Sequence, residues 1–188
     1  MSAPRIVGIG GTTRPGSSGE KMVRAMLDAC AAKGATTQLF GGPELAELPH
    51  FAPEKPERSD AQRAFVEAVR MADGLVIGTP GYHGGISGLV KNAIDLLEDL
   101  NQDTRVYFDG RAVGLIVTAA GWQAGGVTLQ ALRGIVHAMR GWPTPLGIAV
   151  NTVEQKPFDA DGQLVDPALL AQVEMQAEQI LFLAGAAR

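Results

Sequence analysis

The sequence predicts a single-domain, doubly wound α/β protein with a five-stranded parallel sheet. First, strand-like apolar runs alternate with helical patterns along residues 1–188. Second, these runs are continuously apolar, as at Leu75–Ile77 and Val113–Val117, which is typical of strands buried on both faces. Third, the chain is long enough for one large core and contains no linker-like segment. For five strand–helix units, 2-1-3-4-5 is the economical strand order.

Each predicted element follows from a local pattern. The residues Met22, Val23, Met26, Leu27 and Cys30, for example, recur at helical spacing after the first apolar run. Strands are expected at Arg5–Gly10, Thr36–Phe40, Gly74–Thr79, Ala112–Thr118 and Pro145–Val150. Helices are expected at Ser18–Ala32, Asp60–Ala72, Gly88–Leu100, Val127–Met139 and Pro167–Leu183. Segments 41–59 and 151–166 contain proline and acidic residues and are interpreted as surface connections.

Composition limits the possible partners. Hydrophobic residues make up 46% of the chain and charged residues 19%, and a net charge of −4 gives no reason to expect nucleic-acid binding. The lone Cys30 excludes a disulfide framework and a cysteine metal site. The first strand begins almost at once, and no apolar run approaches membrane-spanning length. We therefore expect a soluble, cytoplasmic protein that binds neither a membrane nor a metal.

The segment between the first strand and the first helix predicts an anion site. It places Thr12, Arg14, Ser17 and Ser18 before a helix N-terminus, where free N–H groups favour phosphate. It is not a P-loop, because Ser17 occupies the position of the required lysine. It is not a dinucleotide fingerprint, because Thr13 replaces the third glycine. A monophosphate cradle is the hypothesis, and an ordinary serine-capped helix is the alternative.

Two further glycine-bearing loops are expected at the same edge of the sheet. The loop from Thr79 combines several glycines with Tyr82 and His83, and the segment from Thr118 to Gly126 also contains glycines. Glycines let the backbone approach a flat ligand closely. Because the carboxyl ends of neighbouring parallel strands meet at one edge, the three loops predict a crevice for a phosphate and a planar ring.

At these loops the chain resembles the NAD(P)H-dependent FMN reductase family of flavodoxin-like proteins. The family shows G-S-x-R-x-x-S after the first strand, and residues 11–17 read G-T-T-R-P-G-S. It shows T-P-E-Y-N-x-x-x-x-G-x-L-K-N-A-I-D after the third, matched by residues 79–95, and a glycine-rich segment after the fourth, matched by residues 120–126. The departures are Gly81 for Glu, His83 for Asn and Val90 for Leu.

The resemblance implies a flavodoxin-like fold that binds FMN. It implies that the phosphate is held by Thr12, Arg14, Ser17 and Ser18. It implies that the isoalloxazine is lined by Pro80, Gly81, Tyr82, His83 and Gly84, and on its other edge by Ala120, Gly121 and Trp122. Lys91 and Asn92 are interpreted as structural.

The expected function is that of an FMN-dependent oxidoreductase. Hydride passes from NADPH or NADH to the flavin and then to a small-molecule acceptor such as a flavin, a quinone, an azo dye or a metal oxyanion. The cofactor supplies this chemistry, so no catalytic protein residue is expected. The alternatives are a flavodoxin-like electron carrier and a non-catalytic flavin-binding or nucleotide-binding module. The flavin loops carry no carboxylate, which favours the reductase over a carrier with an acidic face.

The apolar stripes of two helices predict self-association. In the helices 88–100 and 127–139, the apolar arcs span roughly 160° and 200°, wider than packing on a sheet requires. The two helices are neighbours in the predicted order, so their surplus faces would form one exposed patch. We expect a homodimer, or a homotetramer as is also common in the family; the alternative is that loops cover the patch.

Overall fold

Five parallel strands form the centre of the molecule in the order β2-β1-β3-β5-β6. In the computed structural model, which describes residues 2–186, they are β1 (Arg5–Gly10), β2 (Thr36–Phe40), β3 (Gly74–Tyr82), β5 (Ala112–Ala119) and β6 (Trp142–Asn151). This order confirms the predicted topology 2-1-3-4-5. The three central strands are buried almost throughout, as their continuous apolar runs predict.

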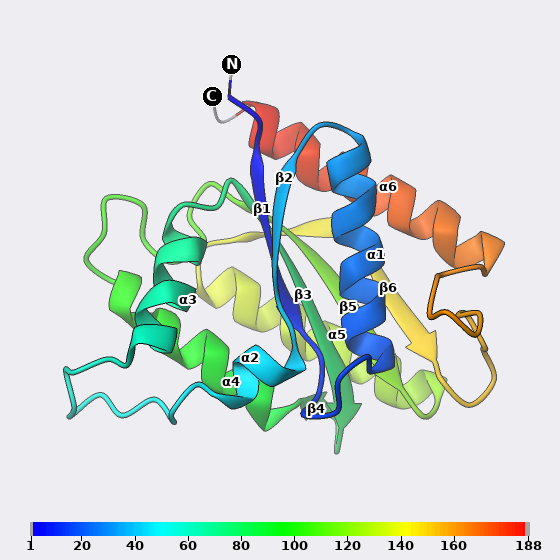
Figure 1. The fold of residues 1–188 in the computed structure, drawn as a ribbon, viewed down its shortest axis with the longest axis horizontal. Helices are drawn as coiled ribbons and strands as arrows, with labels where there is room; N and C mark the ends of the chain where they lie inside the picture. Colours follow the sequence, from blue (N-terminus) through cyan, green and yellow to red (C-terminus); the bar gives the residue numbers. More distant parts are fainter. Residues whose placement is uncertain (1, 187–188) are drawn as a thin grey trace.

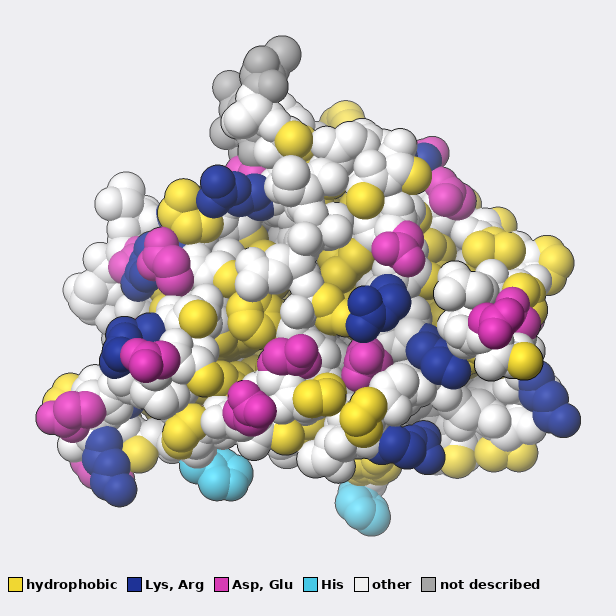
Figure 2. Space-filling view, viewed as in Figure 1, with side chains coloured by type: hydrophobic (Ala, Val, Ile, Leu, Met, Phe, Trp, Pro, Cys, Tyr) yellow, Lys and Arg dark blue, Asp and Glu magenta, His cyan; other side chains and the backbone are white. Residues whose placement is uncertain are grey.

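Helices cover both faces of the sheet (Figure 1). One face packs against α1 (Ser18–Ala32) and α6 (Pro167–Ala186). The other packs against α3 (Asp60–Arg70), α4 (Gly88–Asp95) and α5 (Trp122–Ala138). Each layer encloses its own apolar core. On the face shown in Figure 2, acidic and basic side chains are interspersed.

Four details differ from the sequence-based prediction. A short α2 (Gly42–Ala46) follows β2, and a two-residue β4 (Gly85–Ile86) pairs antiparallel with β3. The predicted helix Gly88–Leu100 is α4 (Gly88–Asp95) followed by a 3-10 helix, η1 (Leu96–Leu100). The prediction that α5 begins at Val127 was wrong: it begins at Trp122, because Gly125 lies inside the helix where it packs against β6.

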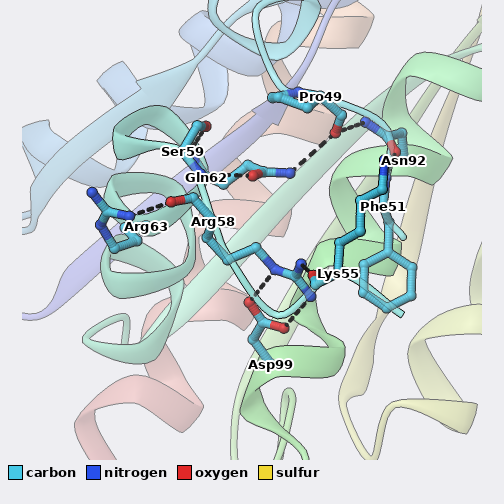
Figure 3. A network of polar contacts seen from close by, with 9 residues as sticks. All are labelled: Pro49, Phe51, Lys55, Arg58, Ser59, Gln62, Arg63, Asn92 and Asp99. Atoms are coloured by element: carbon cyan, nitrogen blue, oxygen red, sulfur yellow. Dashed lines mark hydrogen bonds and ion pairs between the residues drawn. The ribbon is translucent and has the colours of Figure 1, made fainter. Parts of the chain in front are cut away.

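The segment 47–59, which we call the strap, crosses α4 (Figure 3). The Asn92 amide donates to the carbonyls of Leu48 and Pro49 at 3.4 and 3.2 Å, and its oxygen accepts from the Phe51 N–H at 2.8 Å. Arg58 forms a two-pronged ion pair with Asp99 at 2.8 and 2.9 Å. Asn92 therefore holds the strap on α4, a structural role.

The two predicted apolar stripes have different fates. On α4, the residues Val90, Ala93 and Ile94 are buried, so the predicted surplus face of this helix is covered. On α5, Val127 remains 48% exposed. A groove of about 560 Å³ between the two helices is lined by Phe51, Pro53, Lys91, Ile94, Asp95, Glu98, Tyr107, Ile135, Ala138 and Met139. Among the described residues, no helix combines the length and apolarity needed to cross a membrane.

Candidate functional site

A cavity of about 460 Å³ opens beyond the carboxyl ends of β1, β3 and β5. It is lined by Thr12, Arg14, Ser17, Ser18, Gly19, Pro80, Gly81, Tyr82, Thr118, Ala119, Ala120 and Thr152. The structure thus brings together eight of the twelve predicted site residues. The other four, His83, Gly84, Gly121 and Trp122, follow lining residues in the chain but do not line the cavity themselves.

The loop after β1 is shaped by its own hydroxyls. The Thr12 hydroxyl oxygen accepts from the Arg14 N–H at 3.2 Å, which curls the loop. The buried Ser17 caps α1 by accepting from the Glu20 N–H at 3.4 Å. The serine cap considered as the alternative is therefore present, on a loop that also faces the cavity. Within residues 2–186, no carboxylate forms an ion pair with Arg14. This loop has the features of an anion site.

A tight contact supports this loop from behind. A Cβ at Gly42 would lie 1.6 Å from the Thr12 carbonyl oxygen, so the turn into α2 touches the loop backbone directly. The buried Glu20 carboxylate accepts from the Gly42 N–H at 3.4 Å and fixes this turn. The position of Thr12 thus depends on α1 and α2 together.

The loop after β3 is a tight hairpin rather than a flexible connection. Residues 81 and 82 pair with 86 and 85 of β4. The two turn residues, His83 and Gly84, have φ angles of 52° and 80°. Left-handed backbone at both positions is what a two-residue hairpin with a type I′ turn requires. Asparagine and histidine are both enriched in this conformation, so His83 suits a position at which the family pattern has asparagine.

Four lining residues were not among the twelve predicted site residues, although two of them belong to the predicted crevice loop from Thr118: Gly19, Thr118, Ala119 and Thr152. Thr152 follows β6, and both its N–H and its hydroxyl donate to the Ala119 carbonyl at 2.9 and 3.2 Å. These contacts join the loops after β5 and β6. The end-of-strand position of Thr118 and Ala119, at the edge where ligands bind in such sheets, was the available signal.

Large apolar side chains near the cavity are partly exposed. Tyr82 is 54% exposed and Trp122 51% exposed, and Val127 lies beside the hairpin at Gly84. The Trp122 indole N–H donates to the Glu154 carboxylate at 2.9 Å. Among the described residues, no group of three or more His, Cys, Asp or Glu side chains is arranged to hold a metal ion.

Curated proteins with similar sequences include FMN-dependent NADPH-azoreductases. An FMN-dependent NADPH-azoreductase of Staphylococcus haemolyticus is 40% identical over 100 residues, covering 53% of this chain and 49% of the relative. One from Staphylococcus aureus is 35% identical over 116 residues, covering 61% of this chain and 58% of the relative. The chain thus spans about half the length of the curated relatives it matches.

Solved structures share the fold. The flavoenzyme NAD(P)H:(acceptor) oxidoreductase FerB from Paracoccus denitrificans superposes with a TM-score of 0.75 at 17% identity, covering 96% of this chain and 98% of that chain. An oxidoreductase from Corynebacterium diphtheriae gives 0.73 at 19% identity, covering 99% of each chain. The flavodoxin-like fold is therefore confirmed. Residues 4–155 match the family described as NADPH-dependent FMN reductase, and the chain belongs to this family.

Proposed function

We propose that this protein is an FMN-dependent oxidoreductase that takes hydride from NADPH or NADH and reduces a small-molecule acceptor. The observation that carries the proposal is the shared cavity: the loop with Arg14 and the glycine hairpin of β3 face the same space. A phosphate fits the loop with Arg14, and a flat ring fits the glycine hairpin of β3. Membership of the family and the similarity to FMN-dependent NADPH-azoreductases support this assignment.

In this proposal the chain binds and orients the cofactor. Thr12, Arg14, Ser17 and Ser18 hold the phosphate, because hydroxyls, a guanidinium and the α1 N-terminus converge there. The ring lies along residues 80–82 and Ala120, which line the cavity, and residues 83–84 and 121–122 follow them in the chain. FMN, when bound, supplies the hydride chemistry. Binding, orientation and exclusion of water are then the tasks of the protein.

The proposal is tested by the colour of the protein and its response to NADPH. We expect the protein to be yellow or to bind added FMN. Its flavin absorbance should bleach promptly when NADPH is added in the absence of oxygen. A yellow protein that stays oxidised with NADPH and NADH would identify an electron carrier instead. A protein that binds no FMN would contradict both functions.

We also propose a two-fold homodimer through α5 and the groove between α4 and α5, although the apolar face of α4 itself is covered. The support is the groove between these helices together with the exposed Val127 of α5. Light scattering at micromolar concentration is expected to give about twice the 19.7 kDa chain mass; a monomer mass would contradict the dimer, and four times the chain mass would indicate the tetramer. The cytoplasmic location stays a prediction.

A further inference from the structure

The loops after β5 and β6 are joined by Trp122 and Glu154, each of which comes two residues after a residue that lines the cavity. The indole N–H donates to the carboxylate at 2.9 Å. Trp122 comes two residues after the lining residue Ala120, and Glu154 comes two after the lining residue Thr152. The Arg14 loop follows β1, whereas the pair follows β5 and the edge strand β6. The pair therefore lies beside the end of the cavity that is farther from the Arg14 loop.

The backbone that carries Glu154 is held in a defined turn. The oxygen of the buried Asn151 side chain accepts from the N–H groups of Val153 and Glu154 at 3.1 and 3.4 Å. The Gln155 side chain in turn accepts from the Asn151 N–H at 2.8 Å. Bonds of this kind fix the turn and limit the positions that the carboxylate can reach.

The charge of this carboxylate is not neutralised by an ion pair. Within residues 2–186, no lysine, arginine or histidine forms an ion pair with Glu154; its indole partner is a neutral donor. Arg14, the one cationic side chain lining the cavity among the described residues, is assigned to the phosphate in the proposed function. A molecule that enters beside Trp122 therefore meets a negative charge next to an aromatic surface.

We propose that Glu154 and Trp122 select the acceptor, favouring neutral or cationic planar aromatic molecules over anionic ones. This inference rests on the proposed function and names the substrate class of the same site. The indole offers a face for stacking, and its electron-rich surface attracts cations. The Glu154 carboxylate repels anions at the point of entry and, through its bond to the indole, positions that face.

Turnover of acceptors with different charges tests the selection. Glu154→Gln removes the charge and keeps an acceptor for the indole N–H. We expect kcat/KM to rise roughly three- to ten-fold for anionic acceptors, ferricyanide and a sulfonated azo dye, as the loss of one nearby charge predicts. The value for a neutral quinone should stay within about two-fold, and about 0.5 M salt should abolish the difference by screening. Glu54→Gln, on the exposed strap, is the matched control for net charge. It should change kcat/KM neither for the anionic acceptors nor for the neutral quinone.

A second measurement reads the same charge without turnover. The sequence has two tryptophans, so a Trp142→Phe background leaves Trp122 as the single indole emitter. In the full chain without added flavin, Glu154→Gln should make iodide a stronger quencher of Trp122 emission and caesium a weaker one, with acrylamide unchanged.

The two measurements separate the possible failures. The inference would be overturned if the iodide quenching constant and the caesium quenching constant were each the same in the Glu154→Gln protein as in the parent. An equal change in kcat/KM for all acceptors would also overturn it. If the parent protein transfers electrons from NADPH to none of the acceptors while the quenching shift is present, the proposed function fails. The selection of acceptors then fails with it.

Discussion

The buried hydroxyl oxygen of Thr79 accepts a hydrogen bond from the Ser87 N–H at 3.0 Å. Thr79 lies in β3, two residues before Gly81, the first residue of β3 that pairs with β4, and Ser87 immediately follows β4 and caps α4. This bond closes the base of the hairpin that presents Pro80 to Tyr82 to the cavity. The hairpin is therefore tied to the sheet at both ends.

Thr79→Val should lower the free energy of unfolding by about 1–3 kcal/mol, because it leaves the buried Ser87 N–H without its partner. Urea denaturation measures the change. Thr37→Val, at an exposed position of the edge strand β2, is the matched control and should cost far less. Equal stability of the Thr79→Val and parent proteins would show that the bond contributes nothing net.

Arg14→Ala should weaken FMN binding by about 1.5–3 kcal/mol, the scale of a charge-assisted hydrogen bond. Riboflavin, which has no phosphate, should lose little affinity. Fluorescence titration of both ligands measures the difference, and Arg63→Ala on α3 serves as the arginine control. Equal losses for FMN and riboflavin would assign Arg14 to folding rather than to the phosphate.

The effect of replacing His83 on stability should depend on how well the new residue adopts a positive φ, and not on the loss of the imidazole. Its φ of 52° favours glycine and asparagine and penalises a β-branched residue. His83→Asn and His83→Gly should leave thermal stability nearly unchanged or raise it, whereas His83→Val should cost about 1–2 kcal/mol. A stable valine variant would contradict this dependence on backbone conformation.

Asn92→Ala should detach the strap from α4 and cost about 2–3 kcal/mol, because two backbone carbonyls and one N–H lose their partner. Hydrogen exchange should show faster exchange at Phe51, while FMN affinity stays unchanged because Asn92 does not line the cavity. The exposed Asn101→Ala is the control. A loss of FMN affinity with an intact strap would instead place Asn92 in the site.

The sheet could be predicted from the sequence because its central strands are continuous apolar runs such as Leu75–Ile77, which only a doubly covered parallel sheet buries well. The start of α5 could not, since Gly125 and Gly126 indicate a loop by local preference, and only the closeness of Gly125 to Ala149 of β6 explains a glycine inside the helix.

The candidate cavity was predictable where local motifs mark it, as at Arg14 and Pro80, and only partly predictable elsewhere. The Trp122–Glu154 bond joins residues 32 apart in the chain, and it depends on how the ends of β5 and β6 lie side by side. No local pattern contains that information. Segment 151–166 accordingly gave no sign that it supplies the carboxylate partner of Trp122.

The contact between Gly42 and Thr12 has a consequence for how the family's sequences can diverge. A turn with no space for a side chain, fixed by Glu20, separates the cavity from the strap that follows it. Insertions or deletions in residues 47–59 would be absorbed before they reach the loop after β1. We therefore expect changes of length in the exposed part of the strap to leave the geometry around Arg14 unchanged.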